Sequence, residues 1–408
     1  MWTALLHRML DHIVKVGTLH LTMPDGSQHS FGRGEPSLSL ALKDPALPRR
    51  IILNPTLAAG EAYMAGTLEI GGDDLRGFFR FFVPNVNAAG TPWFQRPLTG
   101  TRRALRRLRQ FAPIGKAQAN VAHHYDLSRA LYDLFLDDDR QYSCAYWAEG
   151  VTSLEAAQRA KKHHIARKLM IRPGMTVLDI GCGWGGMGLT LARDYGARVV
   201  GVTLSKEQHA VAVERARAAG LEGQVEFRLQ DYREVTGTFD RIVSVGMFEH
   251  VGVPHYGEYF GFVRDHLASD GLALIHTIGH VGPANEADPW ITKYIFPGGY
   301  TPALSEMQKA VDGAMLVTTD VEVLRLHYAR TLGAWYEQFM AHEAEARALY
   351  DARFVRMWRY YLTSMEASFS VGQLLVYQLQ IGKRLDAAPI TRDYLYDHEM
   401  AMSARAAE

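Results

Sequence analysis

The pattern that most limits the fold of this chain is an alternation of apolar and helical segments between residues 175 and 277. Glycines end the segments 187–195 and 205–219, which predicts helices there. Strand, helix and strand at this spacing favour a parallel sheet with right-handed crossovers, so we expect an α/β fold. The last hundred residues have a largely helical and aromatic pattern. The apolar segments that predict strands are 175–180, 198–203, 225–229, 239–245 and 272–277.

Residues 1–95 lack this alternation and predict a smaller domain of mixed α+β structure. Alternating apolar residues before the turn sequence at 24–27 indicate a hairpin. The segment Arg49–Leu53 has the pattern of another short strand, and the phenylalanine-rich segment 74–82 that of a helix. The remaining residues divide into an expected linker, 96–114, and a larger C-terminal domain, 115–408.

The expected linker is basic, with several arginines spaced to share one helical face. Such a cluster beside phenylalanines can dock on anionic lipid, or it can be a solvated helix packed on a core. The sequence leaves both interpretations open. The arginines are Arg102, Arg103, Arg106, Arg107 and Arg109.

Composition excludes several kinds of protein. Basic and acidic residues balance at 44 each, whereas nucleic-acid binding needs a basic surplus. Two cysteines, Cys144 and Cys182, are too few for a four-cysteine metal site or a disulfide framework, so we expect no metal and a reducing compartment. No apolar run approaches the roughly 20 residues of a membrane span, and the segment 1–16 does not resemble a signal peptide. We expect a soluble, cytoplasmic protein whose membrane contact can only be peripheral.

The segment Val177–Gly185 carries the strongest local signal for a ligand site. A predicted strand runs into Gly181 and Gly183, where glycine lets the backbone pass close beneath a ligand. Glycines alone are weak evidence, because dinucleotide sites and structural turns look similar. Here Asp179 precedes the first glycine, and the continuation towards a pyrophosphate site is imperfect. This arrangement is typical of S-adenosylmethionine sites, and we predict that cofactor.

Further cofactor contacts are expected after the next two strands. No acid follows the second strand, so Thr203 and Gln208 would have to bind the ribose side. The same residues also belong to a helix-capping sequence that begins at Ser205. Asp231 can accept from the adenine amino group with Tyr232 beside the ring, or it can be an ordinary exposed turn aspartate. Spacing alone decides neither case.

Several segments together resemble the cyclopropane-fatty-acyl-phospholipid synthases and the related mycolic acid cyclopropane synthases. The segment 60–66 (GEAYMAG) also resembles the extra N-terminal domain of the phospholipid-acting enzymes, which favours intact phospholipid over a carrier-bound chain. The other segments lie in family order between residue 115 and about residue 385. They are 124–128 (HYDLS), 142–147 (YSCAYW), 178–185 (LDIGCGWG), 201–205 (GVTLS), 248–252 (FEHVG), 276–279 (HTIG) and 294–299 (YIFPGG).

The resemblance implies a Rossmann-like class I S-adenosylmethionine methyltransferase fold with a seven-stranded sheet, preceded by a lipid-binding domain. It implies that a methylene group passes to the cis double bond of unsaturated phospholipid acyl chains, forming cyclopropane fatty acids through a carbocation and a bicarbonate base. It also suggests a homodimer on the inner face of the membrane. The residues that match bicarbonate ligands are Cys144, Glu249, His276, Ile278 and Tyr328. The expected cofactor contacts are Tyr142, Ser143, Asp179, Gly181, Gly183, Thr203, Gln208, Asp231 and Tyr232.

These residues have plainer interpretations when the resemblance is set aside. Cys144 and His276 can be core residues, Glu249 a solvated loop residue, and Tyr328 a core residue with its hydroxyl in water. Met365 stands where some family members have a cysteine, so a thiol at that position is excluded. The alternative functions are a methyltransferase that leaves methyl-branched or methylene chains, and a non-catalytic lipid-binding protein.

Overall fold

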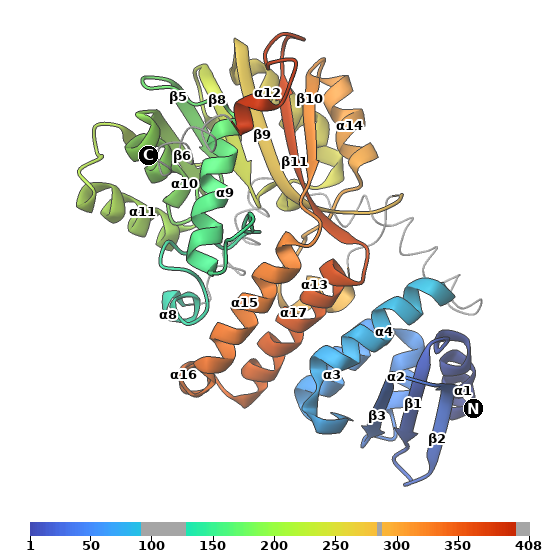
Figure 1. The fold of residues 1–408 in the computed structure, drawn as a ribbon. Helices are drawn as coiled ribbons and strands as arrows, with labels where there is room; N and C mark the ends of the chain where they lie inside the picture. Colours follow the sequence, from blue (N-terminus) through green and yellow to red (C-terminus); the bar gives the residue numbers. More distant parts are fainter. Residues whose placement is uncertain (91–127, 284–287, 397–408) are drawn as a thin grey trace.

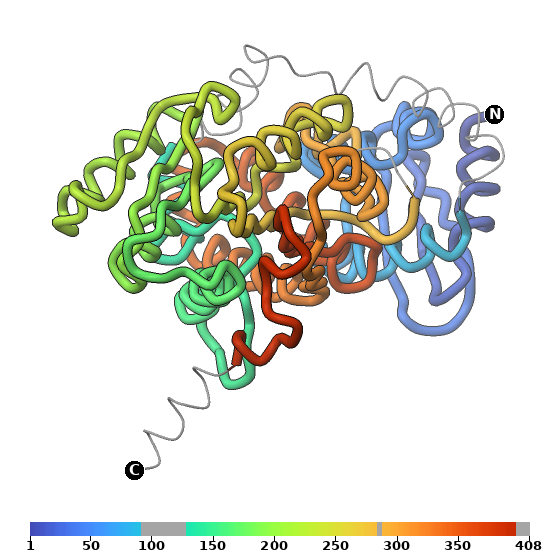
Figure 2. Tube along the Cα trace, turned by 90° about the horizontal axis from the view of Figure 1, so that it is seen from above, coloured from blue at the N-terminus to red at the C-terminus, as the bar shows by residue number. Residues whose placement is uncertain are grey.

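The structure, a computed structural model, describes residues 1–90, 128–283 and 288–396. Within these ranges the chain forms a four-stranded and a seven-stranded sheet, each with its own helices (Figure 1). Seen from above, the N-terminal part lies at one end of an elongated molecule (Figure 2). The expected linker 96–114, with its arginine cluster, lies outside the described residues.

The N-terminal sheet has the order β2–β1–β3–β4. The predicted hairpin is confirmed, since β1 and β2 pair antiparallel with Leu21 opposite His29. The helix predicted at the phenylalanine-rich segment is also confirmed, and Asp74 caps it by accepting from Gly77 N at 2.8 Å. The elements are α1 (Trp2–Ile13), β1 (Gly17–Thr22), β2 (Gln28–Arg33), β3 (Ser37–Leu42), α2 (Leu47–Leu53), α3 (Pro55–Ala65), β4 (Leu68–Ile70), η1 (Gly71–Asp73) and α4 (Leu75–Ala89).

The prediction of a strand at Arg49–Leu53 is wrong, because these residues form the second part of helix α2. Pro48 occupies the first turn of this helix, where its missing N–H costs nothing. Arg50 then pairs with Glu61 of α3 at 2.9 Å, which fixes one helix against the other. A short apolar run does not by itself distinguish a strand from a helix.

The larger sheet has the order β10–β11–β9–β8–β5–β6–β7, which confirms the expected class I methyltransferase sheet. Strands β9, β8, β5, β6 and β7 are parallel, whereas β11 runs antiparallel to both of its neighbours. Helices α9, α10 and α11 cover one face and α12 and α14 the other (Figure 1). Apolar residues of the sheet are buried on both faces, as its near-continuous apolar strands require.

The predicted strands and helices between residues 175 and 277 are confirmed, but β10 and β11 lie in the part whose pattern indicated helices. The elements are α8 (Arg129–Asp133), α9 (Leu154–Lys168), β5 (Thr176–Ile180), α10 (Gly186–Tyr195), β6 (Arg198–Thr203), α11 (Lys206–Ala218), β7 (Val225–Leu229), η3 (Tyr232–Glu234), β8 (Phe239–Val245), η4 (Phe248–His250), η5 (Val253–His255), α12 (Tyr256–His266), β9 (Leu267–His280), α13 (Pro289–Tyr294), α14 (Leu304–Gly313), β10 (Val317–Val323), α15 (His327–Ala341), α16 (Glu343–Leu349), α17 (Ala352–Ser370), β11 (Leu374–Gly382) and η6 (Asp393–Leu395).

Helices α3 and α4 pack the N-terminal part against α13 and α17 of the C-terminal part. Arg76 of α4 bonds Glu366 of α17 at 2.8 Å. At the same interface Gly60 lies so close to Trp290 that an added Cβ would be 2.4 Å from the indole ring. Only glycine fits there, which gives a packing reason for Gly60 in the family-like segment 60–66.

The phenylalanines of α4 belong to this packing. Phe78, Phe79 and Phe81 are buried, so they do not form an exposed apolar surface for lipid. Among the described helices, none combines the length and the apolar composition that a bilayer-spanning helix needs.

Candidate active site

A cavity of about 160 Å³ lies at the carboxyl ends of β5, β6 and β8. This is where open α/β sheets bind their ligands, because the loops that follow parallel strands meet there. Most of the expected cofactor contacts lie at the ends of β5 and β6 or after β7, whereas Tyr142 and Ser143 precede α9, and the fold brings all of them to this cavity. They are Tyr142, Ser143, Asp179, Gly181, Gly183, Thr203, Gln208, Asp231 and Tyr232.

The turn after β5 fits a ligand that carries an ammonium group. Asp179 is 1% exposed, and its Oδ2 atom has no hydrogen-bond partner among the described residues. Burial raises the pKa of this carboxyl to about 7. A buried carboxylate oxygen without a partner is costly unless a ligand satisfies it, and the amino-acid end of S-adenosylmethionine carries a suitable donor.

Gly183 keeps the floor of the cavity open. Its φ of +53° is a conformation that L side chains rarely adopt, and a Cβ added there would meet no atom within 4 Å. The space above this residue therefore belongs to the cavity and not to packed protein.

The segment after β6 forms the predicted helix cap, and its side chains also lie at the cavity. Ser205 caps α11, because its Oγ accepts from Gln208 N at 3.3 Å. Thr203 Oγ1 and Gln208 Oε1 lie 3.1 Å apart, and both residues also line the cavity. The helix cap thus holds these side chains at the ligand space.

Asp231 is not the exposed turn aspartate that one interpretation allowed. It is 3% exposed, and its two carboxylate oxygens accept from Arg233 Nε and Nη2 at 2.9 and 2.8 Å. An adenine amino group would therefore share this carboxylate with the neighbouring guanidinium.

A second cavity of about 540 Å³ adjoins the first. Tyr142, Ser143, Gly246 and His250 line both cavities, so they form the wall between them. The fold brings the residues that match bicarbonate ligands together around the second cavity. They are Cys144, Glu249, His276, Ile278 and Tyr328.

Glu249 is fixed through one of its two oxygens. The backbone N–H of Ile278 donates to Oε1 at 2.6 Å, whereas Oε2 is buried with no hydrogen-bond partner in the described part of the chain. Burial raises the pKa of this carboxyl to about 7, although the amide bond opposes the shift. Glu249 is therefore not a solvated loop residue, and it retains one acceptor oxygen inside the protein.

His276 is a neutral side chain under ordinary conditions, because burial lowers its pKa to about 3. Gln378 lies opposite on β11, and its Nε2 atom is 3.2 Å from His276 Nδ1. When Nδ1 accepts from this amide, the single proton of the neutral ring is on Nε2. That atom is buried and has no partner among the residues described, so it can donate to a ligand without carrying a charge.

Cys144 and Tyr328 complete this group. Burial raises the pKa of the Cys144 thiol, so it stays protonated, and Sγ lies 3.4 Å from Ala145 O. Tyr328 packs edge-on against Trp335, with ring centroids 5.8 Å apart. Met365, the position at which the sequence excludes a thiol, also lines the cavity.

Residues 114–379 match the family described as mycolic acid cyclopropane synthetase. The chain belongs to this family. Residues 3–82 match a second family, which is described as a domain of unknown function. The chain is 38% identical over 355 residues to the cyclopropane-fatty-acyl-phospholipid synthase of Escherichia coli K12, covering 86% of this chain and 90% of the relative. It is 37% identical over 372 residues to a probable fatty acid methyltransferase of Pseudomonas putida, covering 88% and 91%.

Among solved structures, the mycolic acid cyclopropane synthase CmaA1 in complex with SAH and CTAB is 33% identical, with a TM-score of 0.63. The similarity covers 67% of this chain and 99% of CmaA1. Family and fold together identify the chain as an S-adenosylmethionine-dependent enzyme of the methyltransferase class.

Two features of this candidate site were not predicted from the sequence. Helices α3 and α4 of the N-terminal part contribute residues to the second cavity, among them Phe79 and Val83. Helix α9 buries Gln158 and Lys161 beside the wall between the cavities. The family-like segments mark residues that line the cavities directly. The residues of α3, α4 and α9 reach the site only through long-range packing.

Proposed function

We propose that this enzyme transfers a methylene group from S-adenosylmethionine to the cis double bond of an unsaturated phospholipid acyl chain, giving a cyclopropane fatty acid. The observation that carries the proposal is the pair of adjoining cavities. One collects the expected cofactor contacts, and the other sets Glu249, His276 and Tyr328 among aromatic walls.

S-adenosylmethionine fits the first cavity, where Asp179 offers an unpaired buried oxygen and Gly183 leaves open space. When bound, it would supply an electrophilic methyl group. In the proposed reaction an alkene carbon bonds to that methyl carbon as the methyl–sulfur bond breaks, leaving a cation on the acyl chain. Loss of one proton from the new methyl group then closes the ring.

The residues of the second cavity fit a bicarbonate ion. An ionised Glu249 cannot donate, so its Oε2 would accept the ion's O–H. Nε2 of His276 would donate to another oxygen of the ion, and Tyr328 lines the same cavity. Bicarbonate would supply the base, and Glu249 would strengthen that base by polarising its O–H bond.

The walls of the cavity would protect the cationic chain. Water would capture a carbocation as an alcohol, so the site must exclude it. The rings of Trp290, Phe296 and Tyr360 line the cavity and present apolar surface and ring faces that favour a cation.

The lipid as substrate is supported by the relatives' names and by the N-terminal part of the chain. Helices α3 and α4 supply Thr56, Phe79, Val83 and Asn87 to the second cavity, as a lipid-binding domain would. We further propose peripheral contact with the inner face of the membrane, through the basic segment 102–109, and a homodimer as in the family.

The test is incubation with S-adenosylmethionine and vesicles of unsaturated phospholipid, followed by NMR of the fatty acid esters. Cyclopropane methylene signals are expected. A methyl branch or a methylene group would instead support the alternative, which the relative named a probable fatty acid methyltransferase also favours. NMR is required because a cyclopropane and a methylated alkene have the same mass.

A further inference from the structure

Helix α9 holds the wall between the two cavities at several points. The part of this wall that α9 contacts is the segment 141–144, in which Gln141, Tyr142 and Ser143 line the first cavity and Tyr142, Ser143 and Cys144 the second. Gln158 Nε2 donates to the backbone oxygens of Gln141 and Ser143 at 3.1 and 3.0 Å. The wall therefore keeps its position only while α9 keeps its place.

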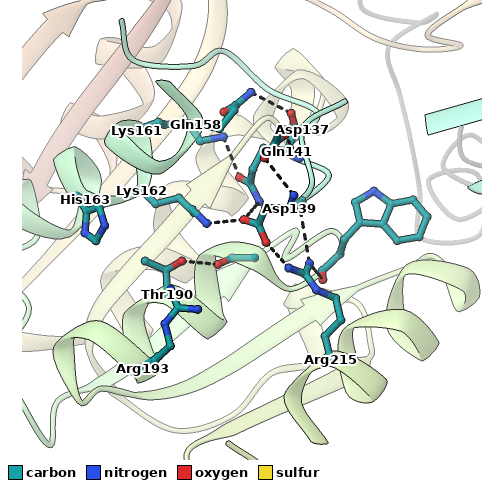
Figure 3. A network of polar contacts seen from close by, with 12 residues as sticks. Asp137, Asp139, Gln141, Gln158, Lys161, Lys162, His163, Thr190, Arg193 and Arg215 are labelled. Atoms are coloured by element: carbon teal, nitrogen blue, oxygen red, sulfur yellow. Dashed lines mark hydrogen bonds and ion pairs between the residues drawn. The ribbon is translucent and has the colours of Figure 1, made fainter. Parts of the chain in front are cut away.

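Lys161 lies one turn further along α9 and binds the side chains of the same two residues. Its Nζ donates to Gln141 Oε1 and to Ser143 Oγ, both at 2.8 Å. Figure 3 shows Gln158 and Lys161 reaching from α9 to Gln141. Backbone and side chain of Gln141 and Ser143 are thus fixed by two neighbouring residues of one helix.

The position of Lys161 is costly for a merely structural residue. The side chain is 0% exposed, and burial lowers its pKa to about 8, so the ammonium is still the main form at neutral pH. Its two hydrogen-bonded partners are neutral oxygens, and Asp137 and Asp139 act on it only from a greater distance. A buried ammonium normally needs close anionic partners, and the first cavity offers room for one.

Ser143 is the link between Lys161 and that cavity. Because its Oγ already accepts from Lys161, the hydroxyl proton points to another acceptor. Ser143 lies on the cavity wall, so its hydroxyl can donate a hydrogen bond to a bound carboxylate. The ammonium of Lys161, which donates to the same hydroxyl oxygen, strengthens that bond.

We propose that Lys161 is a positioning residue that, with Gln158, holds the wall and presents the Ser143 hydroxyl to the carboxylate of S-adenosylmethionine. This inference rests on the proposed cofactor site, but it does not depend on which lipid product is made. Lys161 touches no reacting atom and acts through Ser143.

The test is calorimetry with S-adenosylhomocysteine and with 5′-methylthioadenosine, which lacks the amino-acid end. K161M keeps the length of the side chain and removes its charge. We expect it to weaken S-adenosylhomocysteine binding about tenfold or more, as for loss of a charge-strengthened hydrogen bond, and to leave methylthioadenosine binding within about twofold. S143A should weaken the same ligand selectively, and the K161M/S143A double variant should lose little more than either single variant.

K168M is the matched control, because Lys168 is buried on the same face of α9 but pairs with Asp320 and Glu322 of β10 at 3.3 and 2.6 Å. K168M should lower the melting temperature without changing the ratio of the affinities for S-adenosylhomocysteine and 5′-methylthioadenosine. Equal weakening of both ligands by K161M, or unchanged binding, would overturn the proposal. Should K161M not fold, S143A removes the hydroxyl through which Lys161 acts, and K161R keeps the charge but alters the hydrogen bonds to Gln141 and Ser143, so both should selectively weaken S-adenosylhomocysteine binding. Failure of wild type to bind S-adenosylhomocysteine would instead refute the proposed cofactor site.

Discussion

The backbone N–H of Ile278 on β9 donates to Glu249 Oε1 at 2.6 Å, which commits one carboxylate oxygen to the sheet and leaves Oε2 buried with no hydrogen-bond partner among the described residues. This asymmetry sharpens the effect of Glu249→Gln. The amide oxygen must stay with Ile278, so the NH₂ group takes the place of Oε2 and presents a donor where an acceptor is needed. We expect turnover to fall by about 10²–10⁴-fold, with S-adenosylhomocysteine affinity within about twofold of wild type.

Varying the bicarbonate concentration separates the two possible bases, which are a bound bicarbonate ion and Glu249 itself. His276→Ala and Tyr328→Phe should also lower turnover, and added bicarbonate should partly rescue these two variants by mass action, but Glu249→Gln less. Wild-type enzyme freed of dissolved carbon dioxide should lose activity. Full activity under those conditions would rule out bicarbonate and leave Glu249 itself as the candidate base.

Asp179 and Glu249 predict how the stability of the ligand-free protein depends on pH. Burial raises the pKa of both from ordinary values of 3.8 and 4.5 to about 7. The folded protein therefore holds these protons more tightly than the unfolded chain, so the stabilisation is complete at low pH and is lost as pH rises through about 7. Between about pH 5 and pH 8, melting temperatures of Asp179→Asn and Glu249→Gln should fall less than that of wild type. Parallel curves would contradict the raised pKa values.

Gly183→Val should abolish cofactor binding, because the new side chain would occupy the ligand space and resist a φ of +53°. Gly220→Val is the matched control, since Gly220 has a φ of +66° with nothing within 4 Å of an added Cβ, and lies after α11 away from the cavities. Calorimetry should find normal S-adenosylhomocysteine affinity in the control only. Normal affinity in Gly183→Val would refute the assignment.

Val83→Trp should shift the enzyme towards shorter acyl chains, because it fills part of the second cavity from helix α4. Val86→Trp provides the comparison, since Val86 lies on the same helix but is 45% exposed and does not line the cavity. Competition between phospholipids of different chain length, read by the product ratio, measures the effect. An identical ratio in both variants would show that α4 does not bound the acyl chain.

The arginine cluster predicts salt-sensitive binding to anionic vesicles. Each basic residue near such a surface contributes about 1 kcal/mol, so Arg102→Glu with Arg106→Glu should weaken sedimentation with vesicles, and added salt should do the same. Binding that does not depend on salt would favour the solvated-helix interpretation of this segment.

The part of the larger sheet from β5 to β8, with helices α10 and α11, was predictable because the local sequence pattern and the overall fold agree there. Strands β5, β6 and β8 contain runs of apolar residues, apolar and charged residues alternate in β7, and the glycines after α10 and α11 mark where these helices end. Strands β10 and β11 were not predicted, since β10 (VTTDVEV) is largely polar and the pairing of both strands depends on distant segments. Arg49–Leu53 shows the ambiguity of a short segment in which only three consecutive residues are apolar.

In the candidate site, too, residues in local patterns were predictable and residues that depend on long-range packing were not. Residues on glycine turns and strand ends were predictable from the sequence and from the family resemblance, and the fold places them on the two cavities. Lys161 was missed because charged residues on a helix usually indicate a solvated face, whereas α9 buries Gln158, Lys161 and Lys168. Asp231 could have been better assigned, because Arg233 follows it two residues later and can reach both of its oxygens.

The packing of α4 on α17 has a consequence for how this sequence can change over time. Phe79 of α4 meets Tyr360 of α17 edge-on, with ring centroids 4.9 Å apart, and both line the second cavity. A larger residue on one helix therefore fits only when the residue opposite becomes smaller. The N-terminal and C-terminal parts should accordingly coevolve, and chimaeras that join these parts from distant relatives should need compensating substitutions at α4, α13 and α17.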